Sequence, residues 1–347
     1  MQRVQPYPPP FLHGRIHPSI HPSGRERCRK SLRAVPQSRA FVFSKMAQGE
    51  VQLTSVDSKY CGAGEGKLEI LSEIGAGTFS VVFKAQRVGD GMLVAVKKIK
   101  VKDIRDEKSK AGCMKEMALL QKLDHPHIIK YYTSFIESGD LNIVLELADS
   151  GDLARLIQHF RRCGRLIPEP TIWRYFSQVC AALKYMHLKR IMHRDVKPAN
   201  VFITRDGMAK LGDLGMARFL NLKSTAANTL LGTPYYMSPE RVQEQEYDLR
   251  SDVWSAGCLL YELAALQCPF SSDTKNLVSL FKKIVASDYP PLPSNLYSDE
   301  LRALVSVCMD PNLMKRRDMS YACTVATQMY ERFVRAAACK MQTPSLT

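Results

Sequence analysis

The period of the apolar residues changes near Gly151, and this change restricts the fold more than any other feature of the chain. Between residues 67 and 100, runs rich in β-branched residues are separated by Gly-containing turns, which predicts antiparallel strands. After Gly151 the apolar residues recur at helical spacing, which predicts long helices. The sequence therefore predicts the α+β class: a small β-rich lobe with one helix, then a larger, mainly helical lobe. A ligand is expected in the cleft between the two lobes.

The same periods predict the individual elements. Strands are expected at residues 68–74, 80–87, 92–100 and 141–147, and a helix with one buried face at residues 105–122. Residues 254–266 are apolar on nearly all sides and predict a central buried helix. In the helix expected at residues 171–187, the positions that should be buried are Ile172, Phe176, Val179, Leu183 and Met186.

The formal net charge of +15 is concentrated at one end of the chain. Residues 1–49 carry nine Lys or Arg and one acid, and the other +7 is spread over 298 residues, which is an ordinary basic surface. A nucleic-acid partner is therefore not expected. The first 45 residues hold seven prolines, which predicts a disordered extension at residues 1–66 and disfavours an organelle-import helix. Met46 offers a second start, so residues 1–45 need not belong to the working protein.

The ten cysteines are scattered singly, with no C-x-x-C pair and no His at metal-ligand spacing. This pattern predicts reduced thiols in an intracellular protein, without a disulfide framework or a zinc site. The longest apolar runs are too short to cross a bilayer, so no membrane association is expected.

Two features of the first lobe suggest an anion site. Gly75 and Gly77 lie in a turn between two expected strands, where backbone amides can approach phosphate oxygens, although a plain tight turn explains them equally well. Lys97 lies on the opposite face of its strand from Val94 and Val96 and could pair with Glu116 of the following helix. A lone strand lysine is more often solvated, and the partner makes the functional interpretation stronger.

The strongest cluster is MHRDVKPANVFI at residues 192–203, which places Asp195, Lys197 and Asn200 in one Pro-interrupted loop. Asp213 follows thirteen residues after Asn200, in the glycine-flanked turn Gly212-Asp213-Leu214-Gly215. One Asp can accept the proton of an attacking hydroxyl, and the other Asp and the Asn can bind Mg²⁺ through hard oxygen ligands. Lys197 can neutralise charge that develops on a phosphoryl group.

The order of these motifs resembles the signature of the protein kinases over roughly 265 residues. The resemblance implies a two-lobed kinase fold at residues 67–334, with lobes at 67–148 and 149–334 and a short tail at 335–347. It also implies that Asp195 is the catalytic base, that Lys197 and Asn200 assist it, and that Asn200 and Asp213 hold Mg²⁺. ATP is expected to contact Ile74, Gly75, Ala76, Gly77, Thr78, Phe79, Ser80, Val81, Val82, Ala95, Lys97, Glu116, Leu145, Glu146 and Ala148.

Within that family, Lys197 and the GTPYYMSPE segment at residues 232–240 resemble serine/threonine kinases rather than tyrosine kinases. The comparison implies that Thr233 hydrogen-bonds near Asp195 and Lys197 and that Asp252 anchors the catalytic loop. It also implies a buried structural ion pair between Arg316 and Glu240.

Several segments, among them LNIVLELADSGDL and GTPYYMSPER, resemble the NIMA-related kinases, particularly the short members numbered six and seven. In that branch residues 146–148 would form the hinge that binds adenine, Leu145 would guard the deeper pocket, and Val82 and Ala95 would cover the ring. The expected partners are protein substrates of the spindle, centrosomes, cilia or cytoskeleton, and a longer NIMA-related kinase as activator. The expected location is the cytoplasm, with nuclear, centrosomal, spindle or ciliary pools.

Three positions depart from the commoner kinase pattern: Ser80 replaces the third loop glycine, Leu214 follows Asp213, and Arg317 stands where many kinases have proline. The first two occur in the same branch, so neither argues against activity. Arg317 puts local stability slightly in doubt.

Regulation is expected at Arg194, because an arginine before the catalytic base usually needs an anion to order the activation segment. Phosphorylated Thr229 is the first candidate anion and Thr225 the second, although both could be ordinary loop threonines.

Two other classes of protein stay open at this point. One is a pseudokinase, which would use the same fold as a scaffold, against which the intact motif residues argue. The other is an adaptor that binds nucleic acid or microtubules through the basic N-terminus.

Overall fold

The computed structural model describes residues 60–61, 67–77, 80–100, 121–213, 234–245, 248–271 and 276–342. All of these residues belong to the unit Val56–Thr347. Residues 105–120 of the helix predicted at 105–122, and nearly all of the predicted extension at residues 1–66, lie outside the described residues, whereas residues 121 and 122 lie in a turn.

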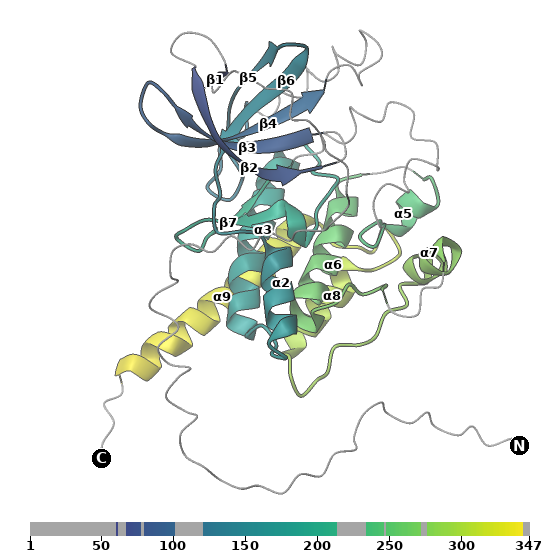
Figure 1. Ribbon diagram of the computed structural model, residues 1–347. Helices are drawn as coiled ribbons and strands as arrows, with labels where there is room; N and C mark the ends of the chain where they lie inside the picture. Colours follow the sequence, from purple (N-terminus) through teal and green to yellow (C-terminus); the bar gives the residue numbers. More distant parts are fainter. Residues whose placement is uncertain are drawn as a thin grey trace, which may run out of the picture. The chain divides into compact units, whose positions relative to one another are not determined.

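A six-stranded antiparallel sheet, in the order β1-β2-β3-β4-β6-β5, forms the first part of this unit (Figure 1). Its strands are β1 (Tyr60–Cys61), β2 (Leu68–Ala76), β3 (Ser80–Arg87), β4 (Leu93–Lys100), β5 (Tyr131–Glu137) and β6 (Asp140–Glu146). The four strands that the sequence predicts correspond to β2, β3, β4 and β6. β1 was not predicted. Its residues Tyr60 and Cys61 lie within the range assigned to the disordered extension, but they pair with Glu69 and Leu68 of β2.

Alternation along β4 separates its two faces. Val94 and Val96 are buried in a small cluster with Leu68, Ala85 and Val144. Lys97 directly follows Val96, and its side chain contacts Asp213, which lies 116 residues further along the chain. As predicted, the lysine therefore points away from the two valines.

The second part is helical, and most of the larger of the two hydrophobic clusters found among the described residues lies in it, although that cluster also includes Ile99 of β4 and Leu141 and Ile143 of β6. Its helices are α2 (Leu153–Arg162), α3 (Glu169–Leu188), α5 (Pro239–Val242), α6 (Arg250–Ala265), α7 (Leu277–Ala286), α8 (Asp299–Cys308) and α9 (Met319–Gln342). The prediction for α3 is confirmed, because each of the following side chains is at most 1% exposed: Ile172, Phe176, Val179, Leu183 and Met186. Among the described helices, none has both the length and the hydropathy to cross a membrane.

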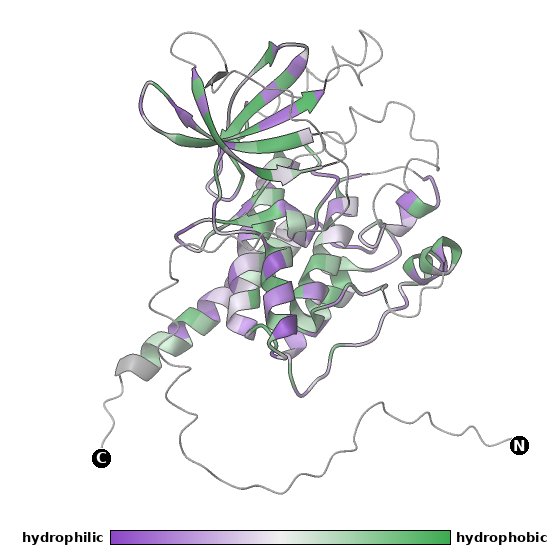
Figure 2. Ribbon diagram, viewed as in Figure 1, coloured by the Kyte–Doolittle hydropathy of each residue, from purple (hydrophilic) through white to green (hydrophobic). Residues whose placement is uncertain are grey.

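Helix α6 is the predicted central helix, and Figure 2 shows it as hydrophobic over most of its length, whereas α2 carries many hydrophilic residues. Twelve of its residues are buried, on all sides of the helix. Gly257 makes the contact with α8 close, since a Cβ there would lie 2.7 Å from Cys308 Cβ and 2.8 Å from Met309 Cγ. Such a helix can be stable only inside a packed core.

Helix α9 continues to Gln342 and so includes part of the tail predicted at residues 335–347. The segment RAAAC at residues 335–339 explains the difference, because alanine has the highest helix propensity. These residues are exposed, so helix propensity rather than burial carries the helix beyond residue 334.

A short hairpin of β7 (Val201–Ile203) and β8 (Ala209–Leu211) positions the chemistry-bearing loops. The 3-10 helix η3 (Pro198–Asn200) leads into β7, and β8 leads to Gly212 and Asp213. Leu211 also forms a parallel bridge with Ile128, which attaches the hairpin to the segment before β5.

Candidate functional site

The loop at residues 192–200 is anchored from α6 by Asp252. Its carboxylate accepts the backbone N–H groups of His193 and Arg194, each at 2.8 Å. This contact confirms the predicted anchor. His187, at the end of α3, adds a hydrogen bond of 2.9 Å to the same carboxylate. Burial raises the pKa of Asp252, but the bond from His187 and the neighbouring histidines outweigh it, so that its pKa lies below the usual value.

His193 links this loop to the turn before Asp213. Its Nδ1 accepts the N–H of Asp195 at 3.3 Å, and its Nε2 donates to the carbonyl of Gly212 at 3.0 Å. A backbone N–H can only donate and a carbonyl can only accept, so the ring is the neutral Nε2–H tautomer. Burial lowers the pKa of His193, in agreement with this state.

Asp195 is oriented by two side chains of its own loop. Lys197 Nζ lies 2.7 Å from Asp195 Oδ2, and Asn200 Nδ2 lies 2.8 Å from the same oxygen. Asn200 Nδ2 also donates to the Asp195 carbonyl at 2.7 Å, which fixes the amide orientation because a carbonyl accepts only. The amide oxygen of Asn200 takes no part in these two bonds, and an amide oxygen is a hard ligand of the kind that Mg²⁺ prefers.

Asp213 lies on a constrained turn beside this loop. A Cβ on Gly212 would lie 2.8 Å from Ile129 Cγ1 and 2.9 Å from the Phe202 ring, so no side chain fits there. The N–H of Gly212 donates to the Asn200 carbonyl at 2.9 Å. Asp213 itself has a φ of 57°, in the left-handed region that Asp tolerates better than most residues.

Lys97 reaches this turn from the sheet, and its ammonium is paired with the Asp213 carboxylate. The lysine side chain is 13% exposed, so it is not the solvated strand lysine of the simpler interpretation. The predicted partner Glu116 lies outside the described residues. The structure therefore brings Lys97, Asp195, Asn200 and Asp213 into one site.

The glycine turn between β2 and β3 closes through a hydrogen bond of 2.7 Å from Gly77 N to the Ser80 carbonyl. Among the described residues, a Cβ on Gly75 or Gly77 would meet no atom nearer than 3.5 Å, and neither glycine has a positive φ. Packing and backbone geometry thus do not require glycine here, which favours the approach of an external group. Ile74 and Ala76 lie on β2 and Ser80, Val81 and Val82 on β3, whereas Thr78 and Phe79 lie outside the described residues.

The residues predicted to surround adenine lie on adjacent strands. Ala95 of β4 is paired with Leu145 of β6, and Val82 of β3 is paired with Lys97. Glu146 ends β6, and Ala148 follows two residues later. The register therefore brings Val82, Ala95 and Leu145 together beside the lysine.

Arg194 has a φ of 69°, and its buried Nε has no hydrogen-bond acceptor among the described residues. The predicted phosphorylation sites Thr225 and Thr229 lie outside those residues, as does Thr233.

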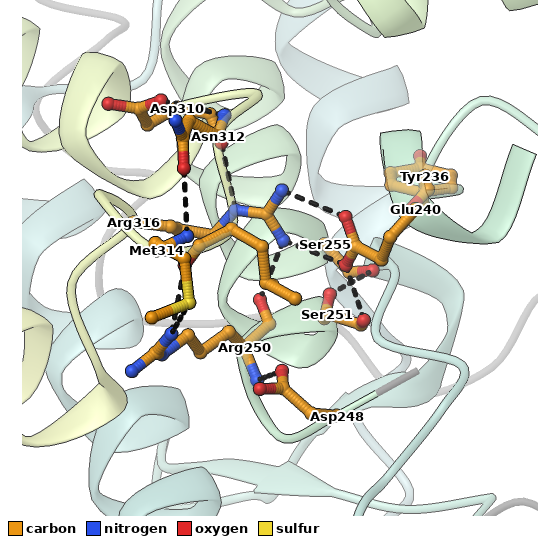
Figure 3. A network of polar contacts seen from close by, with 11 residues as sticks. Tyr236, Glu240, Asp248, Arg250, Ser251, Ser255, Asp310, Asn312, Met314 and Arg316 are labelled. Atoms are coloured by element: carbon orange, nitrogen blue, oxygen red, sulfur yellow. Dashed lines mark hydrogen bonds and ion pairs between the residues drawn. The ribbon is translucent and has the colours of Figure 1, made fainter. Parts of the chain in front are cut away.

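The predicted ion pair between Arg316 and Glu240 is confirmed, and Figure 3 shows it at the centre of a polar network. Arg316 Nη1 and Nη2 lie 2.9 and 3.0 Å from the two carboxylate oxygens. Burial raises the pKa of Glu240, but hydrogen bonds from Arg316 and Ser251 hold it below the usual value. The neighbouring Arg317, which stands where many kinases have proline, is exposed. Its Cζ lies 5.4 Å from the centre of the Tyr321 ring, so its guanidinium has a contact of its own.

Sequence reasoning missed His187 and His193. The motif spelling MHRD contains His193, but nothing in it indicates that both ring nitrogens are used. The contact of His187 with Asp252 joins residues 65 apart, for which a single sequence carries no signal.

Residues 68–328 match the family model described as protein kinase domain. The chain is also 43% identical over 244 residues to the probable serine/threonine-protein kinase nek3 of Dictyostelium discoideum, which covers 69% of this chain and 21% of that protein. It is 40% identical over 257 residues to the probable serine/threonine-protein kinase nek2 of the same organism, a match that covers 73% of this chain and 60% of that protein. It is 39% identical over 236 residues to the serine/threonine-protein kinase Nek1 of Mus musculus, a match that covers 68% of this chain and 19% of that protein. The matched region thus spans less than two thirds of each of these relatives.

Proposed function

Because the chain belongs to the protein kinase family, we propose that it is an active enzyme that transfers the γ-phosphoryl group of ATP to serine or threonine hydroxyls of proteins. The observation that carries this proposal is the Asp195 carboxylate, held by Lys197 and Asn200 beside Asp213. Similarity to serine/threonine-protein kinases supports the choice of acceptor.

The hydroxyl oxygen of the substrate attacks the γ-phosphorus, and the bond between that phosphorus and the ADP oxygen breaks. Asp195 accepts the proton that the hydroxyl loses. Lys197 and Asn200 both contact Oδ2, so Oδ1 is the oxygen available for that proton. Lys197 is 36% exposed, which leaves its ammonium free to follow the negative charge of the phosphoryl oxygens.

The donor set near Asp195 fits a magnesium ion. Mg²⁺ prefers hard oxygen ligands, and the Asn200 amide oxygen and the Asp213 carboxylate are of that kind. Bound there, the ion would neutralise charge on the ATP phosphates. The residues of this chain orient the nucleotide: Lys97 offers an ammonium next to Asp213, and the backbone of the Gly75–Gly77 turn and of the hinge offers amides and carbonyls.

The acceptor assignment can be tested by incubating the purified chain with ATP, Mg²⁺ and peptides that differ only in having Ser, Thr or Tyr at the acceptor position. Mass spectrometry would identify the modified residue. The proposal expects phosphoserine and phosphothreonine. Modification of tyrosine alone, or of no residue after treatment with an activating kinase, would overturn it and favour the scaffold alternative.

We also propose that the chain is a member of the NIMA-related branch, close to the short members six and seven, and acts on mitotic or cytoskeletal proteins. The motifs at residues 141–153 and 232–241 and the Nek relatives support the branch. The cytoplasm with spindle, centrosomal, ciliary or nuclear pools is the corresponding location. Imaging of the tagged chain through mitosis tests it, and uniform distribution at all stages would contradict it.

Activation is proposed to require phosphorylation of Thr229, with Thr225 as the second site. The buried Arg194 Nε, without an acceptor among the described residues, supports a need for an anion. A longer NIMA-related kinase is the proposed activator. Pre-incubation with such a kinase should raise the transfer rate of the wild type and not that of Thr229→Ala, and equal stimulation of both would reject this site.

A further inference from the structure

Two carboxylates bracket the proposed hinge, and both reach cations on the hairpin of β7 and β8. Lys210 Nζ lies 2.9 Å from each carboxylate oxygen of Glu146, the last residue of β6. Asp149 contacts Arg205 at 2.6 Å. The hairpin therefore holds the segment at residues 146–149 at both ends.

The two ion pairs differ in burial. The side chains of Lys210 and Glu146 are 11% and 23% exposed, whereas that of Arg205 is 80% exposed. Solvent screens an exposed pair strongly, and such a pair contributes little, whereas removing one partner of a buried pair leaves an uncompensated charge. The Lys210–Glu146 pair is thus the stronger of the two ion pairs between the hairpin and the hinge, beside the backbone bonds that join Ile203 to Ser150 and Gly151.

Backbone contacts complete the connection around this pair. Lys130 N donates to Glu146 Oε2 at 3.0 Å, and Glu146 N donates to the Lys130 carbonyl at 2.8 Å. The preceding residues pair with β8, since Ile129 N donates to the Leu211 carbonyl at 2.9 Å. Glu146 is therefore held through its side chain and its backbone, and the same short segment touches both the hinge and β8.

β8 continues directly into Gly212 and Asp213, so Lys210 lies three residues before the proposed metal ligand. We propose that Lys210 and Glu146 form a positioning pair that couples the adenine-binding hinge to the Asp213 turn. The inference rests on the proposed ATP-dependent transfer. Neither side chain needs to touch the reacting atoms, because the pair acts by fixing the two segments that bind opposite ends of the nucleotide.

The test compares Lys210→Met, Glu146→Gln and the double variant with the wild type, and measures KM for ATP and for a peptide substrate separately. Each single variant should raise KM for ATP about tenfold, while KM for the peptide stays within about twofold. The double variant should resemble the singles, because either change already breaks the pair. Lys210→Arg keeps a cation and should restore most of the ATP affinity.

The matched control is Arg332→Met, which removes an ion pair of 2.8 Å between α9 and Glu300 of α8 and should leave both KM values unchanged. Arg205→Met should change KM for ATP less than about twofold, since its pair is exposed. Thermal unfolding identifies any variant that fails to fold. If Lys210→Met does not fold, the test is made with Glu146→Gln. This variant should fold, because the glutamine amide oxygen can still accept the hydrogen bond from Lys130 N.

An unchanged KM for ATP in a folded single variant would overturn the inference, and so would an equal rise in both KM values, which indicates a merely structural role. If the wild type transfers no phosphate, the proposed activity fails by itself. The dissociation constant for ADP then replaces KM for ATP, with the same tenfold expectation, so the two failures remain distinguishable.

Discussion

At the scale of residues, buried charges are placed where backbone groups need a fixed partner. Asp252 is 1% exposed and receives hydrogen bonds from two consecutive backbone amides and from His187. A buried carboxylate with three donors is stabilised as an anion. The catalytic loop thus takes its shape from a residue of α6 that does not itself contact Asp195.

Replacing Glu240 by Gln should lower the free energy of unfolding by about 3 kcal/mol, because the buried Arg316 would lose its counter-charge. Chemical denaturation of the two proteins measures the difference. Asp124→Asn is the matched control, since its contact with Lys130 is long and exposed at 3.5 Å, and it should cost less than about 1 kcal/mol. Equal losses in the two variants would contradict the importance of burial.

Stability should fall as the pH drops below about 6.5, the ordinary pKa of histidine. Burial lowers the pKa of His193, and also those of His125 and His127, so below that pH the unfolded chain binds protons that the folded chain does not. The acids Asp252 and Glu240 have lowered pKa values and would contribute only at still lower pH.

The slope for His193 should reach at most about 1.4 kcal/mol per pH unit. Denaturation between pH 7.5 and 5.5 measures it, and His193→Asn should flatten the slope. His159→Gln, at an exposed position on α2, is the matched control for the loss of a histidine side chain. A slope that is the same in all three proteins would mean that other groups titrate in this range.

At the scale of elements, the sequence predicts what has a clear period. The five positions predicted to be buried on α3 are all buried, and on β4 Val94 and Val96 are buried as predicted, although Ala95 between them is buried as well. β7 and β8 have three residues each, too short for any period, and β5 mixes buried and exposed positions at the sheet edge. The contact between Lys210 and Glu146 joins residues 64 apart and could be found only in the fold.

Gly257→Ala tests the close packing of α6 and α8. Helix propensity alone would make this change stabilising by up to about 1 kcal/mol. The Cβ would nevertheless lie 2.7 Å from Cys308 Cβ, so overpacking should dominate and cost about 1–3 kcal/mol. Thermal unfolding decides the sign, and a higher midpoint in the variant would show that α6 and α8 are further apart than described.

At the scale of the whole molecule, the site is assembled from segments far apart in sequence. Lys97 comes from the sheet, Asp195 and Asn200 from the loop after α3, and Asp213 from the turn after β8. The motif spelling predicts that these residues cooperate, and the contact of Lys97 with Asp213 agrees with it. The predicted pair with Glu116 stays a prediction, as do the roles of the threonines at residues 225, 229 and 233.

The central claim is that Asp195 is the base of an active phosphoryl-transfer site. The most direct measurement is the rate of phosphate transfer from ATP and Mg²⁺ to a serine peptide, by the wild type and by Asp195→Asn under the same conditions. The variant keeps the size of the side chain but is not a base, so the rate should fall by at least about a hundredfold, while ADP binding stays within about threefold. Equal rates in the two proteins would contradict the claim.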